Sequence, residues 1–320
     1  MKILGSSETL REILLTKSKC HFSFQEFIEK GTPKHKPKPD LRFLEWFIGF
    51  FEAEGCFLVW EDRGKKRFGV EINQKDPGLM HKIRTRIGFG NALSYQKANG
   101  ETFWRFTIYK KAGLKAFLVL VNGNLITDKK RNQFQAWLRC FNDYFGTFYV
   151  FQTQKPCLSL ENAWLSGFLE GNGGFYISPL KPLIKPISSM SLLKFQMKFY
   201  ITQKEERALL ENIASLFLIV SPIRTVTNEH SIYLYNRLET TQVTSLVLVL
   251  DYLKKHPFLG QRSIQLNRWK RVLPYLQMKY ENLTPKAFLK LQRLIQRTKP
   301  LGKNKNQPKP KTVSSPKGVL

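Results

Sequence analysis

Two nine-residue segments of this chain repeat one another, which predicts a pair of similar structural units. The first segment reads FIGFFEAEG from residue 47, and the second reads LSGFLEGNG from residue 165. In each, a glycine precedes another small residue by four positions: Gly49 before Ala53, and Gly167 before Gly171. Residues one helical turn apart share a face, so these positions predict two helices that approach backbone to backbone at a domain interface.

Acidic residues occur where each of these helices should end. Glu52, Glu54 and Glu170 lie in the last turn, although a helix C-terminus carries partial negative charge and favours cations. A divalent cation is the most economical partner for them, because hard cations take oxygen ligands. The alternative is a pair of core helices whose acids point into water. Each segment closes with a glycine, Gly55 or Gly173, which we expect to be a left-handed helix cap.

The charge balance of the chain indicates a polyanionic partner. Its 320 residues include 52 Lys and Arg but only 24 Asp and Glu, a formal net charge of +28. Nucleic acid is the first candidate partner and an anionic membrane surface the second. No apolar run approaches the ~20 residues that a membrane span needs, so we expect no membrane partner. The four cysteines show no CxxC spacing and the five histidines form no cluster, which predicts neither a zinc site nor a disulfide framework.

Apolar periodicity and composition divide the chain into five parts. We expect an N-terminal extension with a Pro/Lys linker over 1–40, a first domain over 41–142, a linker over 143–160, a second domain over 161–297 and a basic disordered tail over 298–320. In both domains the pattern runs helix, hairpin, helix, hairpin, helix. The predicted class is α+β, with two pseudo-symmetric αββαββα domains, each built on a saddle-like antiparallel four-stranded sheet and joined through the two motif helices.

The alternating strands predict one polar face on each sheet. Arg, Lys, Gln and Asn on such a face can read base edges in a major groove or hold phosphates. Any solvated sheet face would also be polar, but two such faces in a chain of this charge favour binding of DNA. The expected DNA-binding residues are Arg67, Glu71, Asn73, Arg105, Tyr176, Ser178, Lys194, Gln196, Lys198, Arg224, Tyr233, Tyr235 and Arg237.

The doubled motif resembles that of the single-chain, two-repeat LAGLIDADG homing endonucleases, over roughly residues 41 to 295. That resemblance implies a site-specific DNA endonuclease that binds a long double-stranded target as a monomer and uses Mg²⁺. The metal-binding acid of the family occupies the eighth motif position, which is Glu54 in the first copy. The backbone carbonyls of Ala53 and Gly171 should lie beside the metal ions, and the ions would activate water and stabilise the charged oxygens of the reaction.

The second copy departs from the family pattern, because its eighth position is Asn172. An amide offers one neutral oxygen, so metal affinity on that side should fall. Glu170 lies two residues earlier, about 200° around a helix, and cannot simply replace it. Three outcomes stay open: slow cleavage of both strands, cleavage of one strand, or binding without cleavage.

Four further positions follow from the resemblance. Gln74 and Gln203 end corresponding strands, where family members hold active-site waters. Lys129 and Arg262 lie near the start of the last repeat helix, where a basic residue stabilises the scissile region, and Lys130 competes with Lys129 for this role.

The resemblance implies an intron-encoded enzyme of a chloroplast or mitochondrion. The alternatives are an RNA maturase that binds its host group I intron and assists splicing, and a DNA-binding relative that has lost cleavage. Retention of Glu54 and both glutamines favours the enzyme, whereas Asn172 favours the binding proteins.

Overall fold

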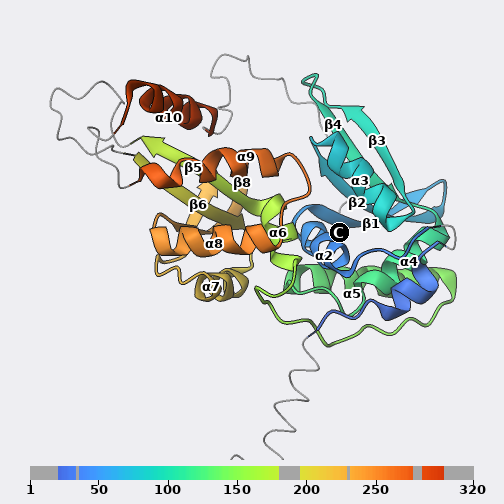
Figure 1. Cartoon of the computed structure of the whole chain (residues 1–320). Helices are drawn as coiled ribbons and strands as arrows, with labels where there is room; N and C mark the ends of the chain where they lie inside the picture. The colour runs from blue at the N-terminus through green and yellow to red at the C-terminus, as the bar shows by residue number, and fades with distance from the viewer. Residues whose placement is uncertain (1–20, 34–35, 180–194, 229–230, 277–282, 299–320) are drawn as a thin grey trace, which may run out of the picture. The chain divides into compact units, whose positions relative to one another are not determined.

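The computed structural model describes residues 21–33, 36–179, 195–228, 231–276 and 283–298. Lys194 and the tail from residue 299 lie outside the described residues, and so does the side chain of Tyr233. The chain divides into two compact units, Met1–Phe168 and Leu169–Leu320, which are described separately (Figure 1). Among the described helices, none has the length and apolar character that crossing a membrane requires.

Unit 1 follows the predicted order of elements. A short π-helix, η1 (Phe27–Gly31), packs against α4. The repeat itself comprises α2 (Leu41–Glu54), β1 (Gly55–Asp62), β2 (Lys65–Gln74), α3 (Pro77–Ile87), β3 (Asn91–Gln96), β4 (Thr102–Ile108), α4 (Lys111–Val121) and α5 (Asp128–Phe145). Side chains cap three of these helices at the N-terminus: Asp40 for α2, Asp76 for α3 and Thr127 for α5.

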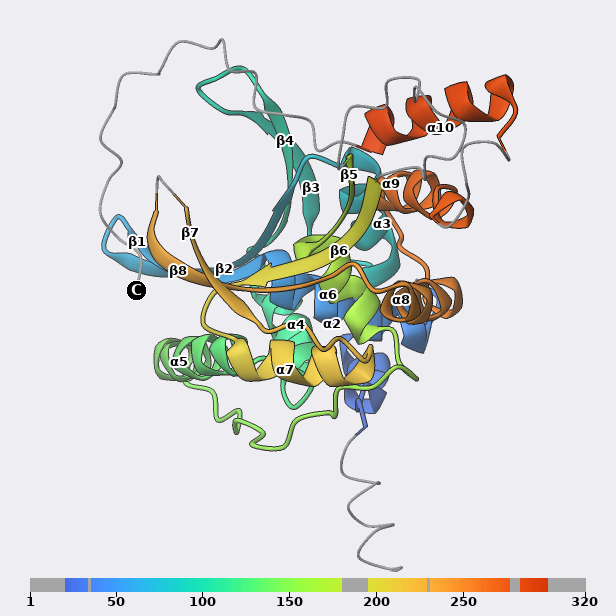
Figure 2. The ribbon, with the colours of Figure 1, turned by 90° about the vertical axis from the view of Figure 1, so that its left-hand side faces the viewer.

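The sheet of unit 1 is antiparallel, with strand order β1-β2-β4-β3. Its apolar residues alternate toward the core, where Phe68, Val70, Ile72 and Phe106 are buried. Helices α4 and α5 contact the sheet and lie along the convex side of its curve (Figure 2). The opposite, concave face therefore carries the polar side chains of the strands.

Unit 2 repeats this arrangement. Its elements are β5 (Gly173–Pro179), β6 (Phe195–Gln203), α7 (Arg207–Leu216), β7 (Arg224–Asn228), β8 (Ser231–Thr240), α8 (Val243–Lys255), α9 (Arg262–Lys270), the 3₁₀ turn η2 (Leu273–Tyr275) and α10 (Pro285–Thr298). The strand order is β5-β6-β8-β7, again antiparallel. Helices α7, α8 and α9 lie on the convex side of this sheet, so its polar face is also concave (Figure 2). The predicted α+β class with two αββαββα repeats is therefore confirmed.

The second motif helix, α6 (Trp164–Asn172), begins in unit 1 and ends in unit 2. Its first part packs closely on α2. A Cβ atom added to Gly49 would lie 1.9 Å from the carbonyl oxygen of Trp164, and one added to Gly167 would lie 1.8 Å from that of Trp46. Only glycine permits such contact between backbones. The predicted pair of Ala53 and Gly171 falls on different units and stays a prediction, as do the predicted domain bounds.

Two expectations from the sequence were wrong. Gly55 is extended, with φ −83° and ψ 161°, and Gly173 is not among the glycines of positive φ, because each begins a strand directly. Gly55 is instead required by close packing, since an added Cβ would lie 2.7 Å from the carbonyl oxygen of Phe51. In addition, Cys157 is disulfide-bonded, whereas Cys56 and Cys140 are free thiols. The fourth cysteine, Cys20, lies outside the described residues.

Candidate metal site and nucleic-acid interface

The two eighth-position residues of the motif occupy equivalent places, each at the end of its motif helix. Glu54 is the last residue of α2, and Asn172 is the last residue of α6. Both side chains are half-buried, as are the neighbouring residues Ala53 and Gly171. At a helix C-terminus the last carbonyl oxygens accept no hydrogen bond from within the helix. Side-chain and backbone oxygen atoms therefore lie close together at each motif end.

Glu52, two residues before Glu54, is fully buried and has a structural role. Its carboxylate accepts hydrogen bonds from the backbone N–H of Ile126 and of Thr127, from the Thr127 hydroxyl and from the Trp164 indole Nε1. The two amides precede α5, so the acid satisfies unpaired donors at the start of that helix. Burial raises the pKa of Glu52 to about 7, and the hydrogen bonds from Thr127, Ile126 and Trp164 oppose this rise.

Glu170 has the same role in unit 2. It is buried and accepts hydrogen bonds from the backbone N–H of Leu259, at 2.8 Å, and of Gly260, at 2.6 Å, just before α9. The positive partners of Glu52 and Glu170 are thus backbone amides, and the cation expected to offset these two acids is unnecessary. This leaves Glu54 and Asn172 as the motif side chains that could face a ligand.

Two basic residues contact backbone carbonyls at the motif ends. Arg262 donates a hydrogen bond from Nη2 to the carbonyl oxygen of Gly171 at 3.3 Å. Lys130 is buried and donates to the carbonyl oxygen of Gly55. Burial lowers the pKa of Lys130, while the carboxylates of Glu52 and Glu54 act to raise it.

The backbone amides that donate to Glu52 and Glu170 show which of the two lysines, Lys129 or Lys130, corresponds to Arg262. Thr127 and Gly260 both donate to the buried acid of their repeat, so Lys129, two residues after Thr127, corresponds to Arg262. Lys129 is half-buried, and Lys130 is the residue drawn into the protein. The sequence alone did not distinguish these two neighbours.

The two candidate glutamines also occupy equivalent places. Gln74 is the last residue of β2 and is opposite Trp104, whereas Gln203 is the last residue of β6 and is opposite Asn236. Both side chains are half-buried. Each is therefore available at the end of the second strand of its sheet.

On the concave face of unit 1, three of the expected DNA-binding residues form one cluster. Arg105 donates from Nε to the Asn73 side-chain oxygen at 3.0 Å and from Nη1 to Glu71 at 3.3 Å. Tyr109 also donates its hydroxyl to Glu71, and burial together with this carboxylate raises the pKa of Tyr109 to about 12. Arg67 lies apart from the cluster and pairs with Asp62 at 3.4 Å, near the tip of the β1–β2 hairpin.

On the concave face of unit 2, the organising residue is Glu239, which the sequence reasoning missed. Its carboxylate pairs with Lys198 at 3.2 Å, Arg237 at 3.0 Å and Arg224 at 3.8 Å. Partial burial opposes ionisation, but the hydrogen bonds and charges of Lys198 and Arg237 lower the pKa of Glu239. Glu239 alternates with Arg237 along β8, so strand periodicity could have placed it on this face.

The remaining expected DNA-binding residues of unit 2 share its polar face by register. Tyr176 is opposite Lys198, Ser178 is opposite Gln196, and Tyr235 alternates with Arg237 along β8. Tyr176 also lies under the Lys198 ammonium, 5.5 Å from ring centroid to nitrogen.

The family model described as LAGLIDADG endonuclease matches residues 47–141 and 165–273 of this chain. The chain belongs to the LAGLIDADG endonuclease family. The two matched segments correspond to the two repeats described above, and each contains one motif helix and one sheet.

Curated LAGLIDADG relatives of this chain are intron-encoded proteins. Probable intron-encoded endonuclease 4 of Neurospora crassa is 24% identical over 72% of this chain and 39% of the relative. Probable intron-encoded endonuclease Cox1-I1b of Schizosaccharomyces pombe is 23% identical over 72% of this chain and 64% of the relative. Intron-encoded RNA maturase bI4 of Saccharomyces cerevisiae is 24% identical over 59% of this chain and 29% of the relative. The chain therefore spans only part of each of these relatives.

Solved LAGLIDADG structures share the fold. The meganuclease I-AabMI, bound to uncleaved DNA, matches with a TM-score of 0.57 and 16% identity over 79% of this chain and 98% of its own. The homing endonuclease I-GzeII, in complex with its DNA target, matches with a TM-score of 0.59 and 14% identity over 79% of this chain and 97% of its own. At these identities the likeness concerns the fold alone.

Each motif helix ends in oxygen donors of the kind that hard cations bind. In unit 1 these are the Glu54 carboxylate and the backbone carbonyls beside it, and in unit 2 they are the Asn172 amide oxygen and the backbone carbonyls beside it. The Asn172 Nδ2 atom is buried and has no hydrogen-bond partner among the described residues. Within those residues, no group of three or more His, Cys, Asp and Glu side chains is arranged so that it could hold a metal ion.

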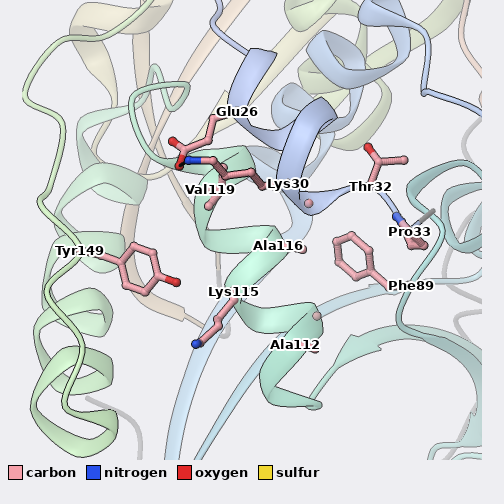
Figure 3. Close-up of a pocket in the computed structure, with 12 residues that line it drawn as sticks. Glu26, Lys30, Thr32, Pro33, Phe89, Ala112, Lys115, Ala116, Val119 and Tyr149 are labelled. Atoms are coloured by element: carbon pink, nitrogen blue, oxygen red, sulfur yellow. Dashed lines mark hydrogen bonds and ion pairs between the residues drawn. The ribbon is translucent and has the colours of Figure 1, made fainter.

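A separate pocket of about 720 Å³ lies between η1, α4 and Phe89 (Figure 3). Its lining mixes apolar residues such as Ala112, Ala116 and Val119 with the ion pair of Glu26 and Lys30. None of the expected metal or DNA-binding residues lines it, so this pocket is distinct from the candidate site.

Proposed function

We propose that this protein is an intron-encoded homing endonuclease that hydrolyses phosphodiester bonds in a long double-stranded DNA target, using a divalent cation. The observation that carries the proposal is the division of labour between the motif acids. Glu52 and Glu170 are buried and bound to backbone amides, whereas Glu54 and Asn172 are half-buried and occupy the last position of their motif helices.

The concave faces supply the DNA-binding part of the proposal. Each sheet presents arginine together with tyrosine, asparagine or lysine on a polar face, in a chain of net charge +28. Such side chains can contact base edges and phosphates, and the overall charge favours binding to a polyanion. The structures of I-AabMI and I-GzeII, which share this fold, contain bound DNA.

Glu54 with the carbonyl of Ala53, and Asn172 with the carbonyl of Gly171, would hold divalent cations, and Mg²⁺ is the proposed ion. When bound, the cation would supply Lewis-acid chemistry and an activated water. The protein's own residues position the scissile phosphate: Arg262 and Lys129 would offset its charge, and Gln74 and Gln203 would hold water molecules. A structure of I-SmaMI with its DNA target in the presence of calcium ions agrees with a divalent-cation site in this fold.

Because Asn172 replaces an acid, we expect the two DNA strands to be cleaved at different rates. A neutral amide oxygen binds a hard cation more weakly than a carboxylate, so cleavage that depends on Asn172 should be slower than cleavage that depends on Glu54. We propose that the enzyme accumulates a nicked product before any double-strand break.

The test is cleavage of DNA that spans the uninterrupted insertion site, using the full chain with Mg²⁺, with Ca²⁺ or with a chelator. Denaturing gels of substrate labelled on either strand separate nicking from double cleavage. We expect Mg²⁺-dependent cleavage that is faster on one strand. Tight, specific binding without any cleavage in Mg²⁺ or Mn²⁺ would contradict the endonuclease function.

An RNA maturase is the second candidate function, favoured by two observations. One curated relative is named as an intron-encoded RNA maturase, and Asn172 removes one carboxylate of the nuclease motif. A maturase should bind its own intron RNA more tightly than an unrelated structured RNA and should speed its splicing. The intron-encoded relatives also support an organellar gene for this protein.

A further inference from the structure

Arg105 and Arg237 occupy the same register position in their two sheets. In unit 1, Gly55 is opposite Ile72, and Arg105 is opposite the next residue of β2, Asn73. In unit 2, Gly173 is opposite Ile201, and Arg237 is opposite the next residue of β6, Thr202. Each arginine also has a partner on the outer strand, so each lies on a central strand of its concave face.

The Arg105 guanidinium is fixed on three sides. Its Nε donates to Asn73 at 3.0 Å and its Nη1 to Glu71 at 3.3 Å, and its Cζ atom lies over the Tyr95 ring at 4.6 Å from the centroid. The carboxylate that holds it is itself immobilised, because Glu71 is 7% exposed and accepts a second hydrogen bond from Tyr109.

The Arg237 guanidinium is fixed in the same manner by different residues. Its Nε donates to Glu239 at 3.0 Å, and its Cζ atom lies over the Tyr200 ring at 4.1 Å from the centroid. The carboxylate comes from β8 here and from β2 in unit 1, yet in both arrangements Nε donates a hydrogen bond and Cζ lies over a tyrosine ring. Two different sets of neighbouring residues thus fix an arginine side chain in a similar way at the same register position.

This arrangement suits the edge of a base better than a phosphate. A carboxylate within hydrogen-bonding distance offsets the arginine charge and would repel a phosphate group. A planar fork held at Nε keeps its outer nitrogens in a fixed direction, which is the requirement for bidentate contact with guanine O6 and N7. The Arg105 and Arg237 side chains are 38% and 27% exposed, so part of each fork is accessible.

We propose that Arg105 and Arg237 each read one guanine in the major groove of the DNA target, and that Glu71 and Glu239 are the residues that position these two arginines. The proposal rests on the proposed function only as far as DNA binding, because reading a base requires no cleavage. It assigns a specificity-determining pair that has one member in each repeat.

The experiment is selection from a randomised double-stranded DNA library by the full chain, in Ca²⁺ or without a divalent cation, followed by sequencing. Arg105→Lys keeps the charge but loses the fork, so the preference for guanine at one position should fall about tenfold or more. Arg237→Lys should do the same at a second, separate position. Arg139→Lys, an exposed substitution on α5, is the matched control and should leave the selected sequence unchanged.

Glu71→Gln tests the positioning role. Removing this negative charge should increase affinity for random DNA while lowering the preference at the Arg105 position, a combination that mere destabilisation would not produce. Unchanged base preference in both lysine variants would overturn the proposal. So would a uniform loss of affinity for all sequences with a shallower salt dependence, which marks a phosphate contact. Failure to cleave in the earlier assay leaves this selection fully informative, so the two proposals fail separately.

Discussion

The carboxylate of Glu52 accepts a hydrogen bond from the indole Nε1 of Trp164 at 2.5 Å. Glu52 lies on the first motif helix and Trp164 begins the second, and the same carboxylate also binds the amides that start α5. One buried acid therefore joins three helices of unit 1.

Glu52→Gln should lower the free energy of unfolding of unit 1 by about 1 to 3 kcal/mol at pH 5, because the amide nitrogen would face hydrogen-bond donors. Glu170→Gln is the matched change in unit 2 and should act similarly, since Glu170 also accepts two backbone hydrogen bonds. Urea denaturation followed by tryptophan fluorescence measures both. Full stability in either variant would contradict the structural role of that acid.

The stability of unit 1 should also depend on pH through Glu52. Because burial raises its pKa from 4.5 to about 7, the folded state retains a proton that the unfolded state has lost between these values. The contribution is complete below pH 4.5 and is lost as the pH rises through 7, amounting to ~3 kcal/mol. Denaturation at several pH values should show this decline in the wild type and a flatter profile in Glu52→Gln.

Gly49→Ala and Gly167→Ala should each destabilise the protein by about 3 kcal/mol or more, because the new methyl group would overlap a backbone carbonyl. Gly78→Ala provides the control: it lies in α3, and its added Cβ would meet only Asp76 Oδ1 at 3.4 Å. That change should be neutral or stabilising by up to about 1 kcal/mol. Equal effects at all three glycines would show that close helix packing is not the cause.

Glu54→Gln should reduce cleavage at least about 100-fold while leaving DNA affinity within about threefold, because the charged oxygen ligand is lost but the sheet faces are intact. Single-turnover cleavage and equilibrium binding in Ca²⁺ measure the two quantities. A chelator should abolish cleavage by the wild type and leave its melting temperature unchanged. Undiminished cleavage by Glu54→Gln would remove this residue from the proposed metal site.

Asn172→Asp should accelerate cleavage of one strand, because a carboxylate binds a hard cation more strongly than an amide. The Mg²⁺ concentration required for half-maximal cleavage should fall as well. Strand-specific labelling identifies which product increases. If binding persists but cleavage is unchanged or slower, Asn172 is not a weakened metal ligand.

Lys129→Met and Lys130→Met should separate the roles of two neighbouring lysines. Lys130 donates to the Gly55 carbonyl from a buried position, so its removal should lower the melting temperature. Lys129 corresponds to Arg262, so its removal should slow cleavage with little change in stability. The reverse pattern would transfer the proposed catalytic assignment to Lys130.

Much of the fold was predictable because period-two alternation is a strong signal. Phe195, Met197, Phe199 and Ile201 alternate with polar residues, and all four are buried. The roles of the motif acids were less accessible. Glu52 and Glu54 are two residues apart and therefore lie on different sides of the helix, but the sequence did not indicate which side meets the loop before α5.

The contacts between charged residues on the concave faces could not be predicted from the sequence either. Alternation places Glu239 on the polar face of β8, but only the paired strands reveal that one carboxylate contacts three cations. A search for DNA-binding residues selects positive charges and passes over the acid that orients them. Pairings of this kind depend on register and on side-chain rotamers, which composition and periodicity do not specify.

The packing of Gly49 against Trp164 and of Gly167 against Trp46 bears on how the protein can be divided. A fragment that stops after α5, at Phe145, would leave the stacked rings of Trp46 and Phe50 without the segment that covers Gly49. Such a half-protein should self-associate or precipitate. A chimaera that takes one repeat from another member of this family therefore needs α2 and α6 segments that come from the same protein.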